Sequence, residues 1–144
     1  MLIGEYRHTI DSKKRIAIPA KFRKDLGTRG FLTRGLDSCL FLYPEKVWEG
    51  IAQKLGELPT GQAGTRSFVR LMLSGAAEVE VDKLGRILVP EYLKEAAGLK
   101  RRVVIAGVFN RIELWDEMAW QDYQQRSQQN AGEIAEKLGD VGAY

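Results

Sequence analysis

The sequence contains one nineteen-residue pattern twice, and this repeat constrains the fold more than any other feature. Residues 8–26 read HTIDSKKRIAIPAKFRKDL, and residues 79–97 read VEVDKLGRILVPEYLKEAA. A displacement of 71 positions aligns residues of the same chemical kind, namely Asp11 with Asp82, Arg15 with Arg86, Ile16 with Ile87, Ile18 with Val89, Pro19 with Pro90 and Phe22 with Leu93. Internal repetition of this kind indicates that one structural unit occurs twice in the chain.

Each copy is predicted to begin with two short strands joined by a tight turn. Ile10 and residues 79–81 fit the apolar-polar alternation of a first strand. Asp11 and Asp82 follow, and an aspartate that opens a turn can accept hydrogen bonds from backbone N–H groups two residues further on. The predicted second strands are residues 15–18 and 86–89.

A short helix is predicted after each second strand. Pro19 and Pro90 suit the first helical position, because proline lacks an N–H group that would have no partner there. Gly27 and Gly98 are expected to end these helices in the left-handed conformation that glycine tolerates best.

A second hairpin and a longer helix are predicted after each unit, with the offset between copies now 72. The expected strands are residues 31–33, 40–43, 103–106 and 112–115, with turns at 35–38 and 107–110. Helices are expected at 44–55, 68–75 and 116–126, and residues 57–64 form the clearest linker. After Gln124 the chain becomes polar, and we expect a frayed or partner-dependent helical tail.

Charge is distributed unevenly along the chain, whose net charge is +3. Residues 1–75 contain 13 Lys and Arg against 7 Asp and Glu, whereas residues 76–144 contain 9 against 12. This asymmetry favours an anionic partner that contacts mainly the first half, although uneven charge also arises by chance.

Few residues suit catalysis or metal binding. His8 and Cys39 are each the single residue of their type, so the sequence offers no paired metal ligands and no defined catalytic dyad. It also contains no glycine-rich phosphate loop and no apolar run of membrane-spanning length. We therefore expect no enzymatic activity, no cofactor or metal, no small-molecule substrate and no membrane association. A lone cysteine fits a reducing cytoplasm.

The two turns are the candidate binding site. Residues 11–15 and 82–86 each place cations on and beside a hairpin tip, and a two-stranded ribbon fits the major groove of B-DNA. We expect Arg15 and Arg86 to contact bases, because a guanidinium can donate two hydrogen bonds to guanine, and the lysines to contact phosphates. The lysines are Lys13, Lys14 and Lys83. In a single hairpin, an aspartate four residues before an arginine would be explained as a contact that only stabilises the turn. The occurrence of the same basic turn twice favours DNA binding instead.

These motifs resemble two known patterns. A strand, a D-x-x-x-R turn, a second strand, a proline and a short helix are similar to the swapped hairpin of AbrB-like DNA-binding domains. Two copies, each followed by a hairpin and a Trp-containing helix, together with the opening residues 1–6, resemble the MraZ family of bacterial regulators. That family usually has glycine before the turn arginine, as at Gly85, whereas Lys14 stands in the first copy. Where this position requires a positive φ, Lys14 costs about 1–2 kcal/mol, and we expect the first turn to differ in shape.

The resemblance implies an α+β fold, mostly β. Two tandem AbrB-like swapped-hairpin repeats would interlock into one pseudo-two-fold β core with short flanking helices. The implied parts are a first repeat at 5–47, a helical connector at 48–75, a second repeat at 76–119, and a C-terminal helix with a polar tail at 120–144.

The resemblance also implies a function. The protein would be a cytoplasmic, nucleoid-associated regulator, usually a repressor, of a bacterial division and cell-wall gene cluster. It would bind short G-rich promoter repeats in double-stranded DNA as a ring-shaped homo-oligomer, with Asp11, Asp82 and Gly85 shaping the two turns. The alternative is an AbrB-like antitoxin or another protein-interaction module, in which the polar tail folds on a partner.

Overall fold

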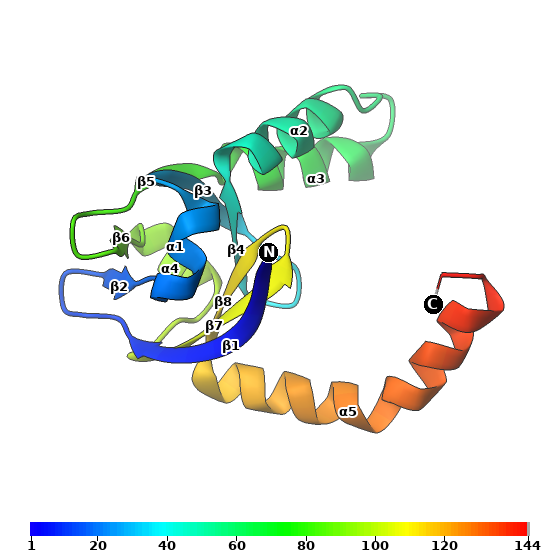
Figure 1. Cartoon of the computed structure of the whole chain (residues 1–144). Helices are drawn as coiled ribbons and strands as arrows, with labels where there is room; N and C mark the ends of the chain where they lie inside the picture. Colours follow the sequence, from blue (N-terminus) through cyan, green and yellow to red (C-terminus); the bar gives the residue numbers. More distant parts are fainter. Residues whose placement is uncertain (144) are drawn as a thin grey trace.

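The computed structural model describes residues 1–143, and Figure 1 shows the order of its elements. The strands are β1 (Leu2–Thr9), β2 (Arg15–Ala17), β3 (Arg29–Arg34), β4 (Leu40–Pro44), β5 (Ala77–Glu80), β6 (Arg86–Leu88), β7 (Arg102–Phe109) and β8 (Ile112–Asp116). The helices are α1 (Ala20–Leu26), α2 (Glu45–Gly56), α3 (Ala63–Ser74), α4 (Glu91–Ala96) and α5 (Glu117–Asp140). The prediction of an α+β fold is confirmed, and its core is an antiparallel sheet.

The two halves of the chain exchange strands. Six antiparallel strands form one sheet in the order β1-β7-β8-β4-β3-β5, so β1 pairs with a strand of the second half and β5 with a strand of the first. The repeat makes β1 equivalent to β5, β3 to β7 and β4 to β8. Exchanging each strand with its equivalent reverses the order of the sheet, so a pseudo-two-fold axis lies between β4 and β8. The remaining strands, β2 and β6, pair with each other in a separate ribbon.

The sheet carries a hydrophobic cluster on each face. The first cluster is shared between the sheet, the β2–β6 ribbon, α1 and α4, and its fully buried side chains include Ile18, Phe22, Leu32, Leu42, Leu93 and Ile105. The second cluster lies under α2, α3 and the first turns of α5, and includes Phe41, Tyr43, Trp48, Met72 and Trp115. Because both halves contribute to both clusters, the core is continuous across the pseudo-two-fold axis.

The predicted ends of the short helices need two corrections. Pro19 and Pro90 precede their helices instead of occupying the first helical position, because their ψ angles of 135° and 144° are extended. Gly27 and Gly98 have positive φ angles of 80° and 60°, as expected of glycines that end a helix. The ψ angle of Gly27 is −155°, however, so this residue lies outside the left-handed helical region.

The predicted turn at residues 107–110 is wrong. Strand β7 continues through Phe109, because the eight-residue β1 pairs along its whole length and places Gly4 opposite Gly107. Val108 N–H donates to Arg111 O at 2.9 Å and closes a tighter turn with Phe109 at φ 67°. In β7 the structural offset from the first copy is therefore 73, and Gly107 is not equivalent to Gly35.

The longer helices also differ in extent from their predictions. Helix α3 begins at Ala63, inside the predicted linker, and packs against α2. The N-cap at Asp116 is confirmed, since its carboxylate accepts a hydrogen bond from Ala119 N–H at 3.3 Å. Helix α5 continues to Asp140, so the expected fraying is wrong, while dependence of the tail on a partner stays a prediction. None of the helices within residues 1–143 is both long and apolar enough to span a bilayer.

We predict that Phe22→Ala lowers the free energy of unfolding by about 3–5 kcal/mol, measured by urea denaturation. The Phe22 ring is fully buried and packs edge-on against Tyr6, with ring centroids 5.3 Å apart, so truncation leaves a cavity between the two halves. Phe68→Ala is the control, because Phe68 is 39% exposed on α3, and it should cost under about 1 kcal/mol. Equal losses for the two variants would contradict the position of Phe22 in the shared core.

Candidate nucleic-acid interface

The first turn is closed by the carboxylate of Asp11. Its Oδ1 atom accepts hydrogen bonds from the backbone N–H groups of Lys13 and Arg15, both at 2.9 Å. Its Oδ2 atom accepts one from Nε of Arg15 at 2.8 Å. Backbone bonds from Lys14 N–H to Asp11 O and from Asp11 N–H to Arg15 O complete the turn. One aspartate therefore sets both the backbone path and the angle of the arginine side chain.

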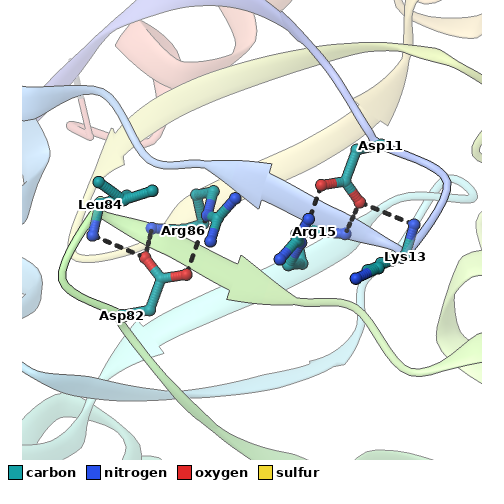
Figure 2. Close-up of polar contacts among 6 residues, drawn as sticks. All are labelled: Asp11, Lys13, Arg15, Asp82, Leu84 and Arg86. Atoms are coloured by element: carbon teal, nitrogen blue, oxygen red, sulfur yellow. Dashed lines mark hydrogen bonds and ion pairs between the residues drawn. The ribbon is translucent and has the colours of Figure 1, made fainter.

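The second turn repeats this arrangement bond for bond. Asp82 accepts from the backbone N–H groups of Leu84 and Arg86 and from Nε of Arg86, each at 2.9 Å. Figure 2 shows the two Asp–Arg pairs on the paired strands β2 and β6.

The expectation that Lys14 gives the first turn a different shape is wrong. Lys14 has φ 62° and Gly85 has φ 78°, so both equivalent residues adopt a positive φ. A side chain at this position is strained, since L residues other than glycine, asparagine and aspartate seldom adopt such angles. The five hydrogen bonds of the turn hold Lys14 in this conformation nonetheless.

The two turns are fixed to each other through the ribbon. Ile16 and Ile87 face each other in the register, and both are buried. On either side, Ile18 N–H donates to Gly85 O and Val89 N–H donates to Lys14 O, both at 2.8 Å. Each turn is thus bonded to the strand end of the other half. Both turn loops project on the side of the molecule away from the carboxyl end of α5 (Figure 1).

The arginine side chains remain partly accessible. Arg15 is 32% exposed and Arg86 is 28% exposed. Each guanidinium uses its Nε to bind the turn aspartate, and within residues 1–143 neither forms a hydrogen bond through its two terminal nitrogens. We call this hydrogen-bonded Asp–Arg pair the clamp. It leaves the outer end of each guanidinium available to a ligand.

The turn aspartates are held in their ionised form. Backbone N–H donors and the arginine lower the pKa of Asp11 below its ordinary value, with the bond from Arg15 N–H the largest cause. The pKa of Asp82 is lowered in the same way, chiefly by the Arg86 N–H group. Both carboxylates are charged at neutral pH and attract their arginines.

The three predicted lysines differ in their surroundings. Lys13 and Lys83 are exposed at the turn tips. Lys14 instead places its Nζ atom 2.6 Å from Oε2 of Glu91, and this contact lowers the pKa of the Glu91 carboxyl. Glu91 corresponds to Ala20 in the first copy, so the second turn has no equivalent acid.

Sequence reasoning missed several cations near the turns. A Cβ atom at Gly85 would overlap the guanidinium of Arg23, whose Nε donates to Ile18 O at 2.8 Å. Lys94, the repeat equivalent of Arg23, lies beside the first turn with Lys100 and Arg101. The shared cation at positions 23 and 94 could have been found in the repeat alignment. The other two lie outside the nineteen-residue pattern.

Residues 1–143 contain no group of three or more His, Cys, Asp and Glu side chains placed to hold a metal ion. Burial raises the pKa of the Cys39 thiol to about 12, so this cysteine is protonated at neutral pH.

The fold and the site together define a duplicated protein that displays two Asp–Arg turns on one ribbon. The model of the family described as "MraZ protein, putative antitoxin-like" matches the chain twice, over residues 1–71 and 72–140. This chain belongs to the MraZ family.

Relatives named "Transcriptional regulator MraZ" match nearly the full chain. The protein of Syntrophomonas wolfei is 49% identical over 142 residues, and that of Acetivibrio thermocellus is 48% identical over 142, each match covering 99% of both chains. The protein of Natranaerobius thermophilus is 46% identical over 140 residues, covering 97% of this chain and 98% of that one. The solution structure of PHS018 from Pyrococcus horikoshii covers 79% of this chain and 88% of its own at 19% identity, but its TM-score of 0.34 is too low to support an argument.

We predict that Gly85→Ala destabilises the protein by about 1–3 kcal/mol in urea denaturation. The alanine would have to adopt a positive φ, and its methyl group would displace the Arg23 guanidinium from Ile18 O. Lys14→Ala is the matched control at the equivalent position, where a side chain already adopts φ 62°. It should cost clearly less, and a larger loss for Lys14→Ala than for Gly85→Ala would be inconsistent with this account.

We predict that the turns lose their carboxylate clamps in acid. Because the pKa values of Asp11 and Asp82 are lower in the folded state, this contribution to stability is complete above the ordinary aspartate pKa of about 3.9. It is lost as the pH falls through the folded-state values. Carbon-detected NMR titration of the two carboxyl groups measures this directly. Midpoints at or above the ordinary value would rule out the clamp in solution.

Proposed function

We propose that the protein is a sequence-specific DNA-binding regulator of transcription whose β2–β6 ribbon enters the major groove. The observation that carries this proposal is the pair of identical Asp–Arg clamps on one rigid ribbon. The major groove of B-DNA is about 12 Å wide and admits a two-stranded ribbon. The relatives' shared name, transcriptional regulator, supports the same function for this chain.

Base recognition is assigned to Arg15 and Arg86. Two terminal nitrogens of a guanidinium match the O6 and N7 acceptors of guanine, and no other base offers the same pair in the major groove. The aspartate bond at Nε holds the guanidinium in one orientation, which reduces the entropy lost when it binds. The clamp is therefore a means of preorganising the arginine for a guanine.

Phosphate contacts are assigned to the lysines. Lys13 and Lys83 extend from the turn tips and can follow a phosphate as flexible point charges. Lys14 would exchange the carboxylate of Glu91 for a phosphate oxygen, so its contribution is reduced by the ion pair it gives up. Asp11, Asp82 and Gly85 shape the turns without contacting DNA.

The family resemblance supports the remaining details of the proposal. We propose that the repeats are AbrB-like swapped hairpins, that the protein acts in the cytoplasm on the nucleoid, and that it represses a division and cell-wall gene cluster. We also propose a ring-shaped homo-oligomer on several promoter repeats. One protomer offers few contacts, and linked binding of several protomers raises affinity without new contacts.

A second candidate function, an antitoxin or other protein-interaction module, is favoured by helix α5. This helix runs for 24 residues without a buried side chain, and its later part exposes Ile134 and Leu138. The matched family is described as antitoxin-like. A partner on this helix would lie away from the turns, so such a role is compatible with DNA binding.

We predict that Arg15→Ala weakens binding to a promoter-repeat duplex by about 1–3 kcal/mol per site and reduces the preference over a scrambled duplex. Lys13→Ala should weaken both duplexes alike and lower the salt dependence by about one counterion. Fluorescence anisotropy at several salt concentrations measures both quantities.

Arg15→Lys is the matched control, because it keeps the charge but lacks the planar fork of donors. It should lose preference much as Arg15→Ala does while retaining more of the general affinity. If Arg15→Ala and Lys13→Ala had equal effects on preference, the assignment of Arg15 to a base would be wrong.

A further inference from the structure

The pseudo-two-fold symmetry of the fold does not extend to the surfaces that flank the two turns. Beside the first turn lies a groove of about 600 Å³, lined by Thr9, Ile10, Asp11, Ser12, Lys14, Lys94, Lys100 and Arg101. The one acid in this lining, Asp11, is already bound to Arg15. Four cations therefore line the groove, and one of them, Lys14, is paired with Glu91 beside it.

The backbone around this groove is firmly held. Ile10 N–H donates to Arg101 O at 2.8 Å, and Lys100 N–H donates to the Asp116 carboxylate at 3.3 Å. The same carboxylate caps helix α5. Lys100 and Arg101 expose their side chains, and no ion pair involves either of them within residues 1–143. The groove is thus a concave surface with a hydrogen-bonded backbone and two exposed cationic side chains.

The equivalent surface beside the second turn is less cationic. Val81 N–H donates to Thr28 O at 2.8 Å, which is the repeat counterpart of the Ile10–Arg101 bond and places Thr28 at the position of Arg101. By the same alignment, Glu80 stands where the first half has Thr9. The second half has Gly85 in place of Lys14 and Thr28 in place of Arg101, whereas Arg23 and Lys83 stand at the positions of Lys94 and Ser12. The equivalent surface therefore has fewer cations than the groove.

We propose that the groove beside the first turn binds the sugar-phosphate backbone of duplex DNA through Lys94, Lys100 and Arg101, and that the second turn makes a weaker contact of this kind. The inference rests on the proposed function and adds three phosphate-binding residues to it. Because Thr28 and Glu80 stand where the first half has Arg101 and Thr9, each protomer would bind the duplex more strongly on the side of its first turn.

The test is a salt titration of the full chain on a promoter-repeat duplex and on a random duplex. The double variant Lys100→Gln/Arg101→Gln removes two cations from the groove. Lys46→Gln/Lys54→Gln removes the same charge from exposed positions on α2. For the groove variant, the slope of log K against log salt should fall by about 2, with weaker binding to both duplexes and an unchanged ratio between them. The α2 control should keep the wild-type slope.

Two outcomes separate the failure of this inference from the failure of the proposed function. The groove alone is overturned if the wild-type protein binds both duplexes and the groove variant keeps the wild-type slope of log K against log salt. The same conclusion follows if the α2 control lowers this slope as much as the groove variant does. A wild-type protein that binds neither duplex overturns DNA binding itself, and the groove with it.

Discussion

The pairing of β2 with β6 is the interaction on which the candidate site depends. Each strand contributes three residues, and an isolated ribbon of this size would not be stable in water. It persists because Ile16 and Ile87 are buried in the shared core, and because each strand end is bonded to the turn of the other half. The packing of two isoleucines thereby fixes the relative positions of two turns that lie 71 residues apart in the chain.

Strand exchange explains why the ribbon can exist in one chain. Since β1 completes the sheet beside β7, and β5 completes it beside β3, neither half has a finished sheet without the other. The hydrophobic clusters on the two faces are likewise built from both halves. The spacing of the turns is consequently a property of the core, and no flexible linker can change it.

The local geometry of the site could be predicted from the sequence, but its surroundings could not. The repeat predicted both turns, because Asp11 and Asp82 act on N–H groups within four residues, and local chemistry decided the result. The end of β7 could not be predicted, since it depends on pairing with β1 about a hundred residues away. The Lys14–Glu91 ion pair and the position of Arg23 over Gly85 arise where the two halves interlock, so no reading of neighbouring residues could find them. The first turn keeps the shape of the second for another reason. Its five hydrogen bonds offset the cost of a positive φ at Lys14, and the backbone preference of a single residue does not include them.

The sequence differences between the two copies make the two ends of the candidate site unequal in charge. Identical halves would present a symmetric surface, which matches a palindrome. Here an exposed lysine, Lys13, in the first turn corresponds to an exposed leucine, Leu84, in the second, and Arg101 of the groove corresponds to Thr28. A duplex bound to this ribbon, as proposed, would be attracted more strongly on one side than on the other, so its two orientations would differ in free energy. In the proposed ring, protomers that each prefer one orientation would favour sites repeated in the same direction over inverted ones. The duplicated fold thus supplies a rigid two-turn ribbon, and the charge differences between its copies supply the polarity.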